Sequence, residues 1–175
     1  MSRAGTFDFS SFSALVFSES DFARNLLSDM CRAFRFKSVV SKADPSAAWD
    51  VFKSEPIDIV VGDIATDKGL DLLKSIRNVE ISPNSLVPFI AAASTSSASY
   101  VRRARDSGAT EFLRLPISST TLIERIIHVV ENPRVFVRAK DYLGPDRRRK
   151  QRPFQGPDRR QTPPAAADGT PVKAA

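Results

Sequence analysis

The sequence predicts an α/β fold in which a doubly wound, five-stranded parallel sheet is followed by a basic C-terminal tail. Five short apolar runs alternate with five segments whose apolar residues recur at helical spacing, all between residues 13 and 132. Alternation of this kind favours a parallel sheet covered by helices on both faces. We therefore expect a flexible leader (1–12), one globular domain (13–132) and a mostly disordered tail rich in Pro and Arg (133–175).

The elements are expected in strict alternation along the chain. Strands are predicted over 14–18, 36–43, 57–63, 86–94 and 110–116, and helices over 20–34, 44–55, 68–78, 96–108 and 118–132. Asp44 suits the N-cap of the second helix, and Pro45 suits its first position. Gly108 is expected to close the fourth helix. Ser118 or Ser119 is expected to cap the fifth.

Apolar side chains at helical spacing mark the buried faces of the first two helices. In the first helix these are Phe22, Leu26, Leu27, Met30 and Phe34, and in the second they are Trp49 and Phe52. The only cysteine, Cys31, is expected to be a buried helix residue. His128 is expected on a face of the last helix.

Charge is distributed unevenly between the domain and the tail. Residues 1–133 hold 15 Lys and Arg against 16 Asp and Glu, whereas residues 134–175 hold 11 against 4. A basic tail on a neutral domain indicates either an anionic partner or a solvated end.

Several classes of protein are excluded by composition and pattern. No apolar run of about 18 residues could span a membrane, and the first dozen residues lack the apolar stretch of a secretory signal. A lone cysteine cannot form an internal disulfide, so we expect a cytoplasmic protein. No metal-ligand cluster, Gly-rich phosphate loop or nucleophile–base pair is found, so we expect no enzymatic activity.

Residues that follow the predicted strands are the first candidates for a functional site, because sites in doubly wound sheets lie at the carboxyl ends of strands. These residues resemble those of response-regulator receiver (CheY-like) domains, the phospho-acceptor modules of two-component signalling. The resemblance rests on "ALVFSESD", "IDIVVGDI" and "GATEFLRLPIS", in that order. It implies a flavodoxin-like sheet of strand order 2-1-3-4-5, with Asp63 as the phosphorylated aspartate. It also implies Mg²⁺ at the site and a protein partner on the face of the fourth helix, fifth strand and last helix.

The sequence departs from the receiver pattern at most of the other site positions. The resemblance implies an acidic pair, but the chain has Ser18 and Glu19 there. It implies a hydroxyl where the chain has Ala93, a switch tyrosine where it has Phe112, and a lysine where it has Leu115. The loop after Asp63 is also short and lacks a proline. We therefore predict a degenerate receiver that acts as a protein-binding adaptor.

Some of the receiver chemistry could persist at neighbouring residues. Glu19 and Asp63 could form a weak metal site, since Mg²⁺ prefers carboxylate oxygens. Ser94 could supply the hydroxyl, and Lys68 or Arg114 could supply the missing positive charge. The alternative to a degenerate receiver is therefore a conventional one that is switched by phosphorylation of Asp63.

The tail repeats Gly-Pro-Asp-Arg-Arg twice, twelve residues apart, within 144–160. Gly-Pro is expected to set a turn that projects the acid and two arginines together. Val135, Phe136 and Val137 are expected to form an extended piece on the domain, with Tyr142 and Leu143 as anchors. Phe7, Phe9 and Phe12 in the leader could pack on the domain or on a partner.

Three hypotheses account for the basic tail. It could be a solvated end, it could bind nucleic acid or an anionic membrane surface through its charge, or it could bind a guanine second messenger such as cyclic di-GMP. Arg can donate two hydrogen bonds to guanine, and Asp can accept from its N–H edge. The stretch "RRRKQR" also resembles the arginine motif of PilZ-type cyclic di-GMP receptors. The candidate ligand-binding residues are Asp146, Arg147, Arg148, Arg149, Arg152, Asp158, Arg159 and Arg160.

Overall fold

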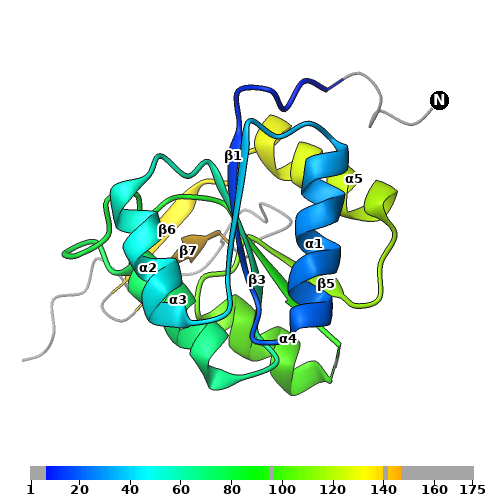
Figure 1. Ribbon diagram of the computed structural model, residues 1–175. Helices are drawn as coiled ribbons and strands as arrows, with labels where there is room; N and C mark the ends of the chain where they lie inside the picture. Colours follow the sequence, from blue (N-terminus) through cyan, green and yellow to red (C-terminus); the bar gives the residue numbers. More distant parts are fainter. Residues whose placement is uncertain (1–6, 95–96, 140–141, 147–175) are drawn as a thin grey trace, which may run out of the picture.

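The computed structural model describes residues 7–94, 97–139 and 142–146. Five parallel strands form one sheet in the order β2-β1-β3-β4-β5, which confirms the predicted order (Figure 1). The strands are β1 (Ser13–Phe17), β2 (Ser38–Lys42), β3 (Ile59–Asp63), β4 (Phe89–Ala93) and β5 (Glu111–Arg114). The helices are α1 (Asp21–Ala33), α2 (Pro45–Ser54), α3 (Asp67–Arg77), α4 (Ala98–Asp106) and α5 (Ser119–Glu131).

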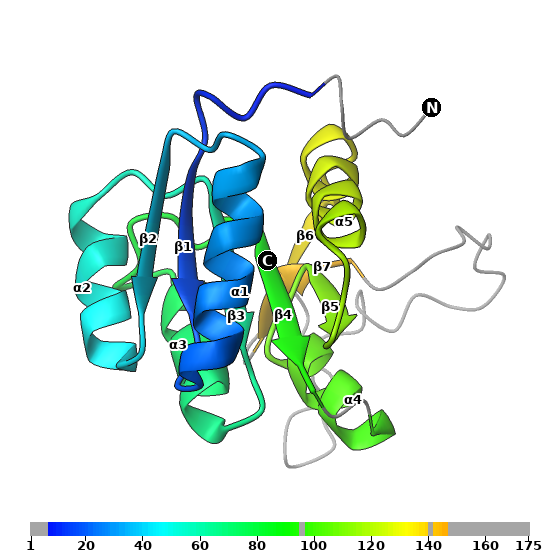
Figure 2. The same cartoon turned by 45° about the vertical axis from the view of Figure 1, so that its right-hand side comes forward.

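Helices cover the sheet on both faces because strand side chains point to alternate faces. In β1, Ala14 and Val16 face the core shared with α1 and α5, whereas Leu15 and Phe17 face the core shared with α2, α3 and α4. Figure 2 shows α1 and α5 on one side of the sheet and α2 and α3 on the other. Both cores are therefore continuous apolar layers, and the carboxyl ends of the strands are left for polar residues.

Capping residues fix where the helices begin and end. The Asp44 carboxylate accepts a hydrogen bond from the Ala47 amide at the start of α2, and Ser118 caps α5 in the same way. Gly108 follows α4 with φ of +91°, a backbone conformation that favours glycine. These observations confirm three of the helix boundaries predicted from the sequence.

The buried face of α1 differs from the one we predicted at Phe22. Leu27 and Cys31 are buried and Met30 and Phe34 pack against the core, as predicted, whereas Phe22 is 77% exposed and Ala23 is buried in its place. The prediction was wrong for Phe22 because helical spacing groups apolar residues on one side of a helix but does not say which residue of its first turn is covered by the core. Burial also raises the pKa of the Cys31 thiol to about 12, as expected for a cysteine that packs as an apolar residue.

Residues 7–12, expected as part of a flexible leader, lie against the domain. Phe9 is only 1% exposed and stacks on Phe36, with 4.6 Å between the ring centroids. Phe7 and Phe12 pack against Phe9 with ring centroids 4.6 and 5.8 Å away. This segment therefore closes one end of the core that α1 and α5 share.

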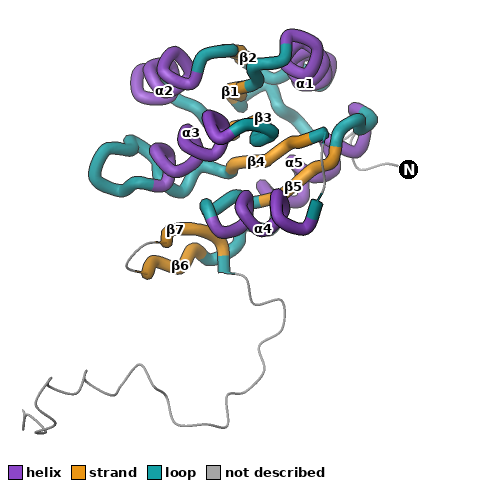
Figure 3. The backbone as a smooth tube through the Cα atoms, turned by 90° about the horizontal axis from the view of Figure 1, so that it is seen from below, coloured by secondary structure: helices purple, strands orange, loops and turns teal. Residues whose placement is uncertain are grey.

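A hairpin follows α5 at the start of the segment expected to be the tail. Strands β6 (Phe136–Ala139) and β7 (Tyr142–Pro145) pair antiparallel and form a separate two-stranded sheet (Figure 3). The first Gly-Pro of the repeat, Gly144 and Pro145, thus lies in a strand and not in the turn that we predicted, because Gly144 pairs with Val137 of β6. Arg147 and every later tail residue lie outside the described residues.

Candidate functional site

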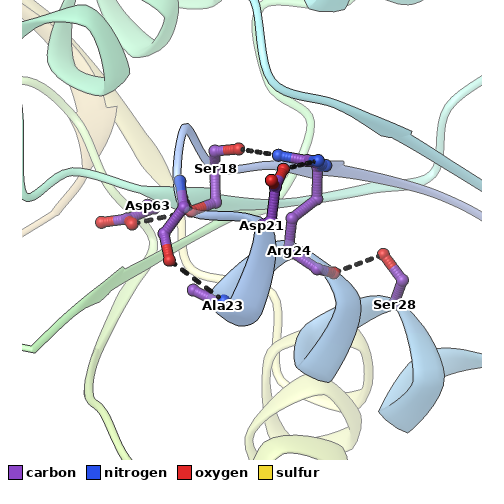
Figure 4. Close-up of polar contacts among 7 residues, drawn as sticks. Ser18, Asp21, Ala23, Arg24, Ser28 and Asp63 are labelled. Atoms are coloured by element: carbon purple, nitrogen blue, oxygen red, sulfur yellow. Dashed lines mark hydrogen bonds and ion pairs between the residues drawn. The ribbon is translucent and has the colours of Figure 1, made fainter.

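The ends of β1 and β3 bring Ser18 and Asp63 together. Ser18 directly follows β1 and is fully buried, and Asp63 is the half-buried last residue of β3. The Ser18 hydroxyl donates to Asp63 Oδ2 at 2.8 Å (Figure 4). The Ala65 amide donates to Asp63 Oδ1 at 2.8 Å. Both oxygens of the candidate acceptor are therefore already hydrogen-bonded.

Ser18 is itself held by the start of α1. Its hydroxyl oxygen accepts from the Ser20 amide at 3.1 Å, and its carbonyl accepts from Arg24 Nη1 at 2.9 Å (Figure 4). Arg24 also pairs with Asp21 one turn earlier on α1. These contacts orient the Ser18 hydroxyl toward Asp63.

Glu19 forms a second polar group at this end of the sheet. Lys68 Nζ lies 2.6 Å from Glu19 Oε1, and the Thr66 hydroxyl donates to Glu19 Oε2 at 2.7 Å. The hydrogen bonds from Lys68 and Thr66 hold the pKa of Glu19 below its usual value, and Glu19 raises the pKa of Lys68. Of the two cations suggested by the sequence, Lys68 thus reaches the site, where it pairs with Glu19.

The remaining predicted site positions carry no polar group toward Asp63. Ala93 is fully buried, and Leu115 packs in the core of α1 and α5. Arg114 is exposed, and Ser94 is exposed after β4. Phe112 is half-buried against the core of α2, α3 and α4, a placement that needs no hydroxyl partner.

The loop after β3 is tied to α4, a link that the sequence reasoning missed. The Tyr100 hydroxyl donates to the Ala65 carbonyl at 3.3 Å, and Arg103 forms an ion pair with Asp67. The Arg103 guanidinium also lies 5.7 Å from the centroid of the Tyr100 ring. No short-range pattern signals this link, because more than 30 residues separate the partners.

The side chains as arranged do not fit a magnesium ion. Mg²⁺ requires several hard oxygens in near-octahedral geometry, and the carboxylate oxygens of Asp63 and Glu19 are all engaged by donors. Within the described residues, no group of three or more His, Cys, Asp and Glu side chains could hold a metal. A metal would therefore have to share these oxygens with the Ser18 hydroxyl, the Ala65 amide, the Thr66 hydroxyl or the Lys68 ammonium.

Other candidates lie away from the strand ends. His128 is exposed on α5, with Asn132 Nδ2 3.5 Å from its Nδ1 atom. Of the candidate tail residues, only Asp146 is described, and its amide donates to the Val135 carbonyl at 2.7 Å. None of the described helices is long and apolar enough to cross a membrane.

Comparison with known proteins identifies the family and supports the fold. The sequence matches the family model of the response regulator receiver domain over residues 14–127, so the chain belongs to the receiver family of two-component signalling. Receiver domains typically bind Mg²⁺ for phosphorylation and interact with signalling partners. No curated protein matches the sequence.

Solved receiver structures share the fold at low sequence identity. The chemotaxis protein CheY4 of Vibrio cholerae is 20% identical with a TM-score of 0.60, over 68% of this chain and 98% of that one. The receiver domain of a DNA-binding response regulator from Colwellia psychrerythraea 34H is 20% identical with a TM-score of 0.61, over 70% of this chain and 100% of that one. A two-component response regulator from Clostridium difficile is 18% identical with a TM-score of 0.62, over 70% of this chain and 98% of that one.

Proposed function

We propose that this receiver is a cytoplasmic, protein-binding adaptor whose acceptor site is held closed by its own side chains and is not switched by phosphate. The observation that carries the proposal is that every oxygen of the two carboxylates already has a donor. Asp63 accepts from Ser18 and from the Ala65 amide, while Glu19 accepts from Lys68 and Thr66. The ammonium of Lys68 supplies positive charge to Glu19 without a divalent cation.

The link between the β3–α3 loop and α4 supports a fixed docking face. Because Tyr100 and Arg103 hold α4 to residues of this loop without a phosphoryl group, the position of α4 does not depend on phosphate arrival. The exposed residues of α4, β5 and α5 include Val101, which is 38% accessible, and Arg102, Arg114 and Arg125. An apolar spot among arginines suits an acidic partner surface.

Phosphate uptake from acetyl phosphate and Mg²⁺, measured by intact mass, tests the closed site. The full chain should gain no more phosphate than Asp63→Asn, which is the matched control. The double change Ser18→Asp with Leu115→Lys restores a carboxylate and a lysine, and it should gain phosphate on Asp63. Uptake by the unchanged chain that disappears in Asp63→Asn would instead favour the conventional alternative, a receiver switched by phosphorylation at Asp63.

A second candidate function is binding of cyclic di-GMP by the basic tail. It is favoured by the position of Asp146, which is tied to Val135, so that the arginines from Arg147 onward start at a fixed point of the domain. Calorimetric titration of cyclic di-GMP into the full chain should give binding that is lost when Arg147, Arg148, Arg159 and Arg160 are changed to Ala. Equal binding of unrelated nucleic acid with a steep salt dependence would point to a tail that recognises charge alone.

A further inference from the structure

The β6–β7 hairpin rests on a defined surface at the ends of α3 and α4, formed by Arg77, Ser107 and Gly108, which we call the hairpin seat. A Cβ atom on Gly108 would lie 2.3 Å from the Leu143 carbonyl oxygen. The absence of a side chain at Gly108 is therefore what lets β7 approach the domain. Arg77 and Ser107 also line a cavity of about 270 Å³ together with Tyr142 and Leu143.

Arg77 holds the other strand of the hairpin to the same surface. Arg77 is 5% exposed, and its guanidinium lies 5.1 Å from the centroid of the Phe136 ring. It donates to the carbonyls of Gly108 at 2.9 Å and of Ser85 and Val87 at 2.8 Å each. One buried side chain thus joins the end of α3 to the segments that lead into β4 and β5 and to Phe136 of the hairpin.

Each residue of the strand that occupies the seat has an observed contact. The Tyr142 ring crosses Gly144, where a Cβ atom would lie 2.4 Å from the Tyr142 hydroxyl and 2.8 Å from the Gly108 Cα atom. The Tyr142 hydroxyl donates to the Pro145 carbonyl at 3.1 Å. Pro145 is buried, and the Asp146 amide closes the pairing on Val135.

The chain holds a second copy of this pattern. Residues 142–146 read Tyr-Leu-Gly-Pro-Asp, and residues 154–158 read Phe-Gln-Gly-Pro-Asp. The aromatic ring, the glycine beneath it, the proline and the acid are all retained. Only the Tyr142 hydroxyl and the aliphatic Leu143 side chain are missing, and Leu143 meets Gly108 through its backbone carbonyl.

We propose that the hairpin seat binds either unit, so that 154–158 can replace 142–146 beside β6. This inference goes beyond the proposed function and does not depend on it. The first unit has the advantage in the resting chain, since it has the Tyr142 hydroxyl and the shorter connection to Ala139. The longer connection to Phe154 adds only a logarithmic entropy cost. Exchange would enclose the basic run 147–152 between two fixed ends.

Chemical crosslinking in the full chain tests the exchange. In a Cys31→Ala background, Ser107→Cys is combined with either Leu143→Cys or Gln155→Cys, which are equivalent positions of the two units, and treated with a short bismaleimide. Adding Gly144→Val should lower the 107–143 crosslink and raise the intramolecular 107–155 crosslink at least fivefold. The control Gly156→Val alone should leave the 107–143 crosslink unchanged.

Hydrogen exchange gives an independent readout on chains without introduced cysteines. The amides of β6 should stay protected in Gly144→Val, because the second unit takes the seat, and should lose protection in Gly144→Val with Gly156→Val. The proposal is overturned if β6 loses protection in Gly144→Val alone, or if the 107–155 crosslink does not rise. It is also overturned if that crosslink forms only between two chains.

Discussion

The two ends of the sheet hold their charges in opposite ways. At the carboxyl end, Glu19 and Lys68 form an ion pair whose side chains are 33% and 61% exposed, so solvent screens it. At the amino end, Arg77 is buried with three carbonyls as its main acceptors, and burial lowers its pKa to about 10. The ion pair at the carboxyl end is therefore screened by water, whereas the Arg77 guanidinium at the amino end is held by buried acceptors.

This difference indicates where the chain is rigid. In a receiver, the strand-end loops surround the acceptor site, and here the ion pairs that connect them are exposed to solvent. The hairpin at the other end rests on a buried cation that cannot change partners without leaving carbonyls unsatisfied. We therefore expect substitutions at the amino end to cost more stability than substitutions at the candidate site.

The largest effect is expected for Arg77→Met. The change keeps the apolar stem but leaves the carbonyls of Gly108, Ser85 and Val87 without their donor, so unfolding should become easier by about 3 kcal/mol. Urea unfolding followed by circular dichroism measures the loss. Arg125→Met, at an exposed position of α5, is the control and should change little. A loss at Arg77 no larger than at Arg125 would contradict a rigid amino end.

A smaller loss, about 2 kcal/mol, is expected for Gly108→Ala. The positive φ of +91° disfavours alanine, and the new Cβ atom would press on the Leu143 carbonyl. Thermal unfolding compares it with Ser107→Ala, its neighbour in an ordinary helical conformation. If both variants unfold at the temperature of the unchanged chain, the hairpin does not rest on Gly108.

At the candidate site, Ser18→Ala should cost only about 1 kcal/mol. It removes the hydroxyl that donates to Asp63, but Asp63 keeps its bond from the Ala65 amide and is half open to water. Ser94→Ala, at an exposed position after β4, serves as the control in urea unfolding. A loss as large as that of Arg77→Met would remove the contrast between the two ends.

The smallest effect is expected for Glu19→Gln, and it should depend on pH. Because Lys68 and Thr66 lower the pKa of Glu19 in the folded chain, its contribution is present above the ordinary value of 4.5 and is lost as pH falls through the lowered folded value. The urea midpoints of the two chains should therefore differ slightly at pH 7 and converge once the pH falls below the lowered folded value. In 1 M salt at pH 7 the two urea midpoints should also coincide, because salt screens the ion pair between Glu19 and Lys68.

The fold could be predicted from the sequence because its signals are local. Apolar runs, caps such as Asp44 and Ser118, and the closing Gly108 each act within a few residues. The exposure of Phe22 could not be predicted, since helical spacing groups apolar residues on one side of a helix but does not say which residue of its first turn is covered by the core. The hairpin was predicted only in part, since an extended segment was expected at 135–137 but a turn at Gly144 and Pro145. Gly-Pro favours a turn but can also occur in a strand at the edge of a sheet.

The candidate site could be located but not described from the sequence. The strand ends placed Ser18, Glu19 and Asp63 in one region, as found. The partners of their oxygens could not be predicted, because Lys68 reaches Glu19 across 49 residues and its direction depends on where α3 begins. Arg77 was also missed, since a lone arginine at a helix end is usually solvated.

The hairpin changes how shortened versions of this chain must be designed and read. A version that stops at Asn132, just after α5, would remove the arginine-rich residues and also β6 and β7. Arg77 would then lose its contact with the Phe136 ring. Any activity lost by such a deletion could come from an uncovered guanidinium and not from missing arginines. A stop after Asp146 separates the two causes, because it spares every contact of the seat.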